Sequence, residues 1–265
     1  MTFKLLFAIV TQMNHQIPSI YRAALLVLVG ILFLGVTPAK ASTVLIDFTA
    51  GTSPAGSTPT TGGLQWNNVN TGITTSLVGS YSLIDTTGAS FGTMTFASGS
   101  NWATNNSNTG YTVGAVGNFP VTATADFLFI NNNAGITTAT FTLTGLDTTG
   151  TVQYNFTWLS SRAAADVSGR PITMTFTGAN SGFATENATL SPSSAGNSTT
   201  QTVSGIIASP TGTITVTSQN TAAQFAYLNA MQIDAVPEPS AAALSILGGL
   251  GLFVVVIRRR QLAQV

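Results

Sequence analysis

The chain contains no cysteine and a single histidine, His15, near its amino terminus. The lack of cysteine excludes disulfides, thiol nucleophiles and thiolate zinc sites. Because the region 42–235 has no histidine either, it also lacks the usual general base of a serine hydrolase. An ordinary hydrophobic core must therefore hold the fold, and a region of this length is long enough to build one.

Charge is scarce as well. The full chain has eight basic and eight acidic side chains and a formal net charge of zero. The region 42–235 has only two basic and seven acidic side chains, so it carries no basic patch that could neutralise phosphates, and nucleic acid is excluded as the expected partner. These nine residues are Asp47, Asp85, Asp126, Asp147, Arg162, Asp166, Arg170, Glu186 and Asp234.

Long apolar runs occur only near the two ends. The first covers residues 23–36, follows Arg22 and is succeeded by Ala39-Lys40-Ala41. Small residues at Ala39 and Ala41 are typical of a signal-peptide cleavage site, which predicts a signal peptide over residues 1–41 that is cleaved before Ser42. A membrane anchor is the alternative for this run. Met13 would give a more regular signal peptide than Met1 and is an alternative start.

The second apolar run covers residues 241–257 and is bounded by helix-breaking prolines and by arginines. Seventeen residues in a helix span about 25 Å, near the short limit for a bilayer core. Pro237 and Pro239 exclude an earlier helix start. The triplet Arg258-Arg259-Arg260 predicts a cytoplasmic end, which leaves the region 42–235 outside the inner membrane.

These carboxyl-terminal features resemble a known sorting signal. Val236-Pro237-Glu238-Pro239, the glycine-containing apolar helix and Arg258-Arg259-Arg260 follow one another as in the PEP-CTERM tails of Gram-negative bacteria. The resemblance implies that residues 236–265 are a sorting tail processed by an exosortase, with Val236 to Pro239 as the recognition motif. It also implies a transient anchor in the inner membrane through residues 241–257, final placement at the cell surface or in the matrix, and association with exopolysaccharide or biofilm.

The region 42–235 has the pattern of an all-β domain. Val152, Tyr154, Phe156 and Trp158 alternate with polar residues, a period of two that predicts a strand with one buried face. Phe225, Tyr227, Met231 and Ile233 are expected to share one face. About ten short strands separated by turn sequences predict a two-sheet, jelly-roll-like β-sandwich between a signal helix and a transmembrane helix. The expected strands are 44–48, 63–66, 80–84, 93–96, 123–130, 139–143, 152–158, 172–176, 200–207 and 213–217.

Short segments of this region resemble β-sandwich modules of bacterial surface proteins. Leu45-Ile46-Asp47-Phe48 and the run from Tyr227 to Ile233 are similar to the first and last strands of galactose-binding-like jelly rolls. The resemblance to surface modules is carried by the runs 143–147, 154–157 and 160–162 and by Gly178. It implies a sandwich fold and points toward glycan binding.

Few residues suggest catalysis. Gly88-Ala89-Ser90-Phe91-Gly92 fits the nucleophile-elbow pattern, but neither a histidine base nor an α/β sheet accompanies it. A glycosidase would need two facing carboxyl groups, for which Asp126 with Asp166, or Asp147 with Glu186, are the candidates. Asp85-Thr86-Thr87-Gly88 and Asp147-Thr148-Thr149-Gly150 are instead typical of turns.

No cofactor is implied. A structural calcium ion suits such a sandwich, but no dense acidic loop identifies its ligands.

One loop gathers the two arginines of the region. Ser160, Ser161, Arg162, Asp166 and Arg170 lie between two expected strands. They either clamp the loop through an arginine–carboxylate pair or bind a sugar or uronate, with an aromatic ring stacked on the sugar. The candidate stacking residues, in loop-like sequence, are Trp66, Trp102 and Tyr111, whereas Trp158 fits the core.

The sequence therefore predicts an exported, non-catalytic surface or matrix protein associated with exopolysaccharide. A dedicated carbohydrate-binding module, with Trp66, Trp102, Arg162, Asp166 and Arg170 as its site, is the alternative. A glycosidase that depends on two carboxylates is a more remote alternative.

Overall fold

A computed structural model of the chain describes residues 41–48, 63–69, 76–104, 119–120, 123, 127–161, 170–188, 200–220 and 225–238. The described residues all belong to one structural unit, Lys40–Val265. Of the predicted signal segment only Ala41 is described, and the membrane segment 241–257 and Arg258, Arg259 and Arg260 lie outside the described residues. No helix among the described residues has the length and hydropathy needed to cross a membrane.

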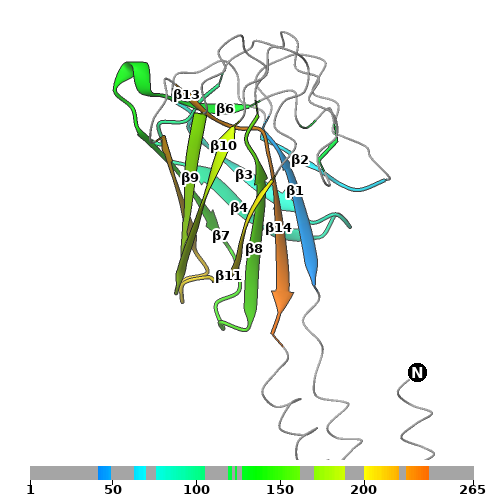
Figure 1. Ribbon diagram of the computed structural model, residues 1–265. Coiled ribbons are helices and arrows are strands. Elements are labelled where there is room, and N and C mark those ends of the chain that lie inside the picture. The colour runs from blue at the N-terminus through cyan, green and yellow to red at the C-terminus, as the bar shows by residue number, and fades with distance from the viewer. Residues whose placement is uncertain are drawn as a thin grey trace, which may run out of the picture. The chain divides into compact units, whose positions relative to one another are not determined.

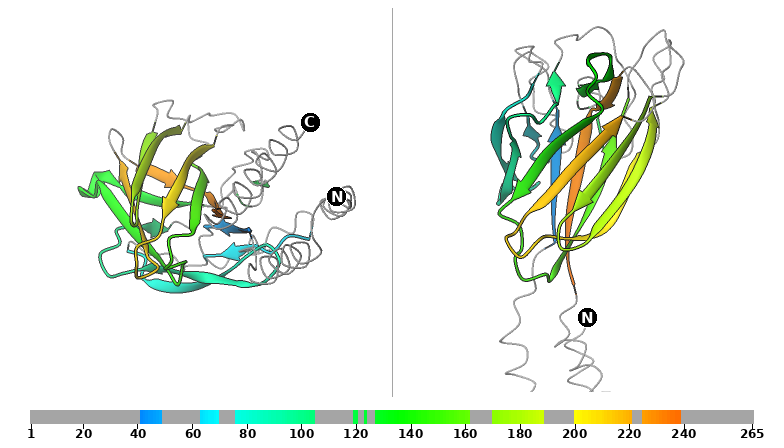
Figure 2. Two further views of the ribbon diagram at one scale, coloured as in Figure 1. Left: turned by 90° about the horizontal axis from the view of Figure 1, so that it is seen from below. Right: turned by 90° about the vertical axis from the view of Figure 1, so that its left-hand side faces the viewer.

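Two mainly antiparallel sheets face each other and form a sandwich (Figures 1 and 2). The five-stranded sheet has the strand order β11-β8-β14-β1-β2, in which only the β1–β2 pair is parallel. Its strands are β1 (Ser42–Asp47), β2 (Asn67–Asn68), β8 (Val152–Leu159), β11 (Gln201–Ile207) and β14 (Ala230–Pro237). The six-stranded sheet has the order β10-β9-β12-β7-β4-β3. Its strands are β3 (Gly79–Ile84), β4 (Ser90–Phe96), β7 (Thr138–Thr144), β9 (Arg170–Thr177), β10 (Ser181–Ala188) and β12 (Ile214–Asn220).

A small third sheet lies at one end of the sandwich (Figure 1). It consists of β13 (Phe225–Leu228), β6 (Leu128–Asn131) and β5 (Ala103–Thr104), and the 3-10 helix η2 (Asn132–Ala134) follows β6. Period-two alternation gives this sheet two different faces. Leu128, Ile130, Ala226 and Leu228 join the main core, whereas the residues of the opposite face form a separate aromatic cluster.

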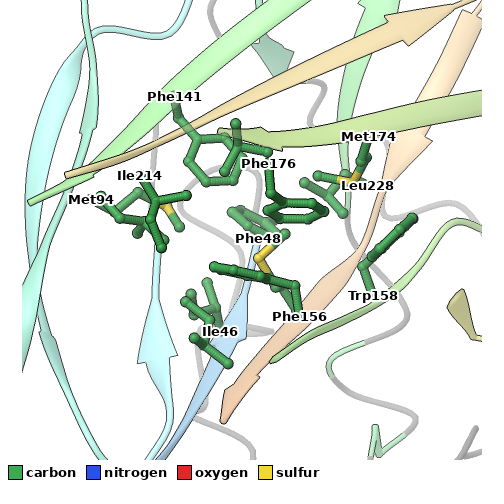
Figure 3. Packing of buried hydrophobic residues seen from close by; sticks show 14 of the residues in the cluster. Ile46, Phe48, Met94, Phe141, Phe156, Trp158, Met174, Phe176, Ile214 and Leu228 are labelled. Atoms are coloured by element: carbon green, nitrogen blue, oxygen red, sulfur yellow. The ribbon is translucent and has the colours of Figure 1, made fainter. Parts of the chain in front are cut away.

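The main core is built from the inward residues of both large sheets (Figure 3). Phe156 of β8 and Phe176 of β9 stack across the layers with ring centroids 4.2 Å apart and planes inclined by 20°. Trp158 lies 5.6 Å from the same Phe176 ring and is fully buried. Other residues alternate with these apolar ones along β8 and β9. The two strands therefore present mostly Thr, Asn and Gln outward while their apolar faces are buried.

The predicted all-β fold is confirmed, with strands close to most of the expected ranges. The strand expected at 63–66 is instead the two-residue β2, and Ala123 precedes β6 and lies outside any strand. Phe225 and Tyr227 do not share a face with Met231 and Ile233, which corrects that expectation. Asn229 separates β13 from β14: its N–H donates to Leu159 O and its O accepts from Phe48 N, so the chain passes there from the small sheet into the five-stranded sheet.

Candidate functional site

The first and last strands of the sandwich lie side by side. β1 pairs with β14 antiparallel from Ser42 opposite Ala235 to Asp47 opposite Ala230. Ala41, at the predicted cleavage site, is exposed immediately before β1, while Ala39 lies outside the described residues. The chain therefore enters and leaves the domain at the same end. The small sheet lies at the opposite end, because β13 leads into the start of β14 (Figure 1).

Three residues of the predicted sorting motif belong to the folded domain. Val236 and Pro237 are the last residues of β14, opposite Gln153 and Val152 of β8. Glu238 N donates to Thr151 O at 2.8 Å, and Gln153 Nε2 donates to Glu238 Oε1. Pro239 lies outside the described residues.

The register also explains how a proline fits into β14. Hydrogen-bonded and non-hydrogen-bonded pairs alternate along antiparallel strands. Because Glu238 donates to Thr151, the pair formed by Pro237 and Val152 is a non-hydrogen-bonded one. The nitrogen of Pro237 consequently points away from β8. The proline therefore removes no hydrogen bond between β14 and β8.

Arg170 begins β9 and is buried against the outer face of the small sheet. Its Nη1 donates to Tyr227 Oη at 2.8 Å. The guanidinium carbon lies 5.4 Å from the Phe225 ring centroid and 5.6 Å from that of Tyr227, within the range of cation–π attraction. Phe127 packs edge-on against Tyr227, with centroids 4.8 Å apart. We call Arg170, Phe127, Phe129, Phe225 and Tyr227 the arginine–aromatic cluster.

The tryptophans proposed for sugar stacking are buried and lie apart. Trp66 is 5 % exposed and packs in a cluster with Phe119, whereas Trp102 is fully buried in the main core. Neither belongs to the arginine–aromatic cluster. Trp66 packs in its cluster with Leu45 and Leu159, whose chain neighbours Ile46 and Trp158 point into the main core, so the two tryptophans belong to different apolar clusters. Arg162, Asp166 and Tyr111 lie outside the described residues. Trp158 is in the core, as predicted.

The serines of the same loop are buried at the end of β8. Ser160 and Ser161 are both fully buried, and Ser161 N donates to Asn229 Oδ1 at 2.7 Å. Asn229 is the residue at which the chain crosses from the small sheet to β14, so this contact fixes the junction between the two sheets.

Two aspartates form turns, as their sequences predicted. Asp85 Oδ1 accepts from Thr87 N and Ala89 N, and Asp147 accepts from the N–H groups of Thr149, Thr151 and Val152. Burial alone would raise the pKa of Asp147, but these hydrogen bonds outweigh it and hold the pKa below its ordinary value.

Of the remaining chemical candidates, the described residues place only the serine of the elbow-like sequence. Ser90 starts β4 within the β3–β4 hairpin, so it is not on a strand-to-helix elbow. Asp126, Asp166 and the Glu186 side chain lie outside the described residues, so the structure does not test the predicted carboxylate pairs. Within the described ranges, no three His, Cys, Asp or Glu side chains gather as a metal site.

The outer face of the six-stranded sheet is covered by hydroxyl groups. Cross-strand registers align Thr140, Thr217 and Thr175 in one row, with Phe183 at its end on the edge strand β10. Phe183 is 73 % exposed. We call this surface the hydroxyl face. Phe183 was not among the predicted site residues because the sequence pattern did not predict β10. The other outward side chains on the described strands of this face are neutral, and most are Thr or Ser.

No protein family and no curated protein matches this chain. Among solved structures it is similar to a CBM35 module from Cellvibrio japonicus, with 15 % identity, a TM-score of 0.28, and coverage of 51 % of this chain and 86 % of that one. It is similar to a family 35 carbohydrate-binding module from Clostridium thermocellum, with 14 % identity, a TM-score of 0.27, and coverage of 50 % and 87 %. It is also similar to TmCBM61, solved in complex with beta-1,4-galactotriose, with 12 % identity and a TM-score of 0.25. That match covers 43 % of this chain and 72 % of the other. Likeness at this level carries no functional conclusion.

Proposed function

We propose that this chain is an exported, non-catalytic surface or matrix protein that a PEP-CTERM-like tail sorts and an exosortase processes. The observation that carries the proposal is the position of the motif. Val236 and Pro237 continue the last strand beyond Ala235, which pairs with Ser42, the first residue after the predicted signal cleavage. Both export elements therefore meet the domain at one end, so the small sheet at the other end is turned away from the membrane.

The chemistry of the domain supports a non-catalytic role. Asp85 and Asp147 are engaged in turns, and Asp234 accepts from Thr43 Oγ1 at 2.7 Å on the outer face of β14. Carboxylates that bond to their own backbone and neighbours stabilise the fold and do not face one another across a cleft. The surface then offers hydroxyl and amide groups, which suits contact with polysaccharide more than with charged partners.

Alanine at Pro237, Glu238 and Pro239 together is expected to keep the full-length protein in the inner-membrane fraction. The motif is lost while the apolar helix and the arginines that hold it in the membrane are kept. Fractionation and immunoblotting of the producing bacterium measure the distribution. A matched control is alanine at Ser209, Pro210 and Thr211, a proline-containing turn between β11 and β12. Normal release of the motif variant would contradict the proposal.

A carbohydrate-binding sandwich is a second candidate function, favoured by the hydroxyl face. An exposed phenyl ring can stack on a sugar ring, and threonine hydroxyls can both donate and accept hydrogen bonds. The absence of charge on the described part of this face suits a neutral polysaccharide. This surface differs from the site proposed at Trp66, Trp102, Arg162, Asp166 and Arg170, since two of those residues are buried tryptophans.

Phe183→Ala is expected to weaken binding to the producer's own purified matrix polysaccharide about tenfold, the loss expected for a buried aromatic contact of about 1.5 kcal/mol. Cosedimentation measures it. Val78→Ala, a change at a residue 61 % exposed before β3 at the other edge of the sheet, is the control. Arg162→Ala tests the loop site in parallel. Equal binding by the wild type and Phe183→Ala would rule out the hydroxyl face.

A further inference from the structure

We infer that the folded domain keeps its own sorting motif inaccessible to the processing peptidase. Gln153 is the positioning residue that holds the motif against the domain. Val236, Pro237 and Glu238 must leave the edge of β8 before a processing peptidase can bind them. The inference rests on the proposed function, because it concerns the same motif. It adds the residues that regulate access to that motif.

The motif is held by backbone and side-chain contacts on one side. Val236 and Pro237 pair with Gln153 and Val152, and Glu238 N donates to Thr151 O at 2.8 Å. The Gln153 side chain donates to the Glu238 carboxylate. On the other side, β1 begins only at Ser42 opposite Ala235, so the end of β14 extends beyond this partner strand. These residues are therefore the part of β14 that can detach without opening the sandwich.

The distance to the membrane makes detachment necessary. Only Pro239 and Ser240 separate Glu238 from the predicted membrane segment 241–257. Two extended residues span at most about 7 Å. A single helix with its side chains is about 10 Å across, so no enzyme domain fits between the folded sandwich and the bilayer. Releasing three more residues adds about 10 Å of chain.

Detachment also frees the groups that a peptidase needs. Enzymes and binding domains that take extended peptides commonly bind them through backbone N–H and C=O groups, as an added strand. While β14 is complete, Glu238 N is engaged by Thr151, and the Glu238 carboxylate is engaged by Gln153. Both the N–H and the carboxylate of Glu238, the acidic residue of the motif, are therefore hydrogen-bonded to the domain itself.

A disulfide across the pair Gln153 and Val236 tests this directly. The two residues are directly opposite each other, and the register makes them a hydrogen-bonded pair with Cα atoms about 5.5 Å apart, within disulfide range. The chain has no cysteine, so Gln153→Cys with Val236→Cys adds the only possible bridge. Thr157→Cys with Gln232→Cys, an equivalent pair on the same two strands but upstream of the motif, is the matched control.

We expect the oxidised Gln153–Val236 bridge in the full-length protein to lower processing at least tenfold in pulse-chase labelling of the producing bacterium. Dithiothreitol restores processing of the same variant, and this comparison cancels any effect of replacing Val236. The control bridge is processed at the wild-type rate. Equal processing of the Gln153–Val236 variant in its oxidised and reduced forms would overturn the inference, provided that processing occurs.

The double-cysteine variant could fail to be processed in both its oxidised and its reduced form, because Val236→Cys alters the motif. Gln153→Ala leaves the motif intact and tests the inference in that case. Loss of the contact with Glu238 is expected to shorten the processing half-time at least twofold, whereas Asn155→Ala at the next outward position of β8 leaves it unchanged. An unchanged half-time for Gln153→Ala overturns the inference in that case. If the wild type is not processed at the motif, or the triple alanine variant is processed normally, the proposed function itself fails.

Discussion

Phe176→Ala is expected to lower the free energy of unfolding of the domain by about 3–5 kcal/mol, the usual cost of removing a large buried aromatic ring. Phe176 is fully buried and stacks on Phe156 of the opposite sheet at 4.2 Å. Its ring also lies 5.6 Å from Trp158, so the substitution leaves a cavity between the two layers of the sandwich (Figure 3). The two sheets lose a contact that joins them directly.

Urea unfolding of residues 42–238, followed by tryptophan fluorescence, measures this loss. The matched control is Phe183→Ala, the same change one strand away, at a ring that is 73 % exposed. It is expected to change the stability by less than about 0.5 kcal/mol. Similar effects of the two substitutions would show that Phe176 does not lie at the centre of the core.

The strands that the sequence predicted well are those whose buried face is large and apolar. In β8, Tyr154, Phe156 and Trp158 point inward and their neighbours point outward, so the period of two is visible without tertiary information. The two aspartate turns were equally local, since Asp147 bonds to residues two to five positions further along the chain.

β10 could not be predicted because its pattern is the reverse of a normal strand. Phe183 points to solvent, while Gly182 points inward, where a Cβ atom would lie 2.8 Å from a methyl carbon of Val203. The small inward residue is imposed by the close approach of β11, the next strand in the sequence but a member of the opposite sheet, so the sequence pattern does not show this contact. The aromatic residue of the hydroxyl face was missed for this reason.

The placement of the site residues depended on tertiary contacts that the sequence does not show. Trp66 and Trp102 occur in loop-like sequence, yet both are buried, and Arg170 is held by Tyr227, a residue 57 positions away. The sorting motif is a prediction that rests on the residues of the tail alone. The pairing of these residues with β8 was not predicted. A proline normally indicates the end of a strand, and only the structure shows that the nitrogen of Pro237 points away from β8.

Arg170→Ala is expected to lower the free energy of unfolding by about 2–4 kcal/mol. The substitution removes a nearly buried guanidinium that lies over Phe225 and Tyr227, and it removes the donor to Tyr227 Oη. A hydrogen bond to a charged group contributes about 1.5–3 kcal/mol, and a desolvated cation–π contact about 2 kcal/mol. Arg170→Lys keeps the charge but loses the planar donor geometry, so an intermediate loss is expected.

The same variants distinguish a structural clamp from a sugar-binding arginine. Tyr227→Phe removes only the acceptor, and its effect should be strongly non-additive with Arg170→Ala in a double-mutant cycle, with a coupling of at least about 1 kcal/mol. Because Arg170 is 5 % exposed and its guanidinium donates to Tyr227, polysaccharide binding per folded molecule should be unchanged in Arg170→Lys. If Arg170→Ala has wild-type stability and loses polysaccharide binding, Arg170 is a ligand contact and the clamp is refuted.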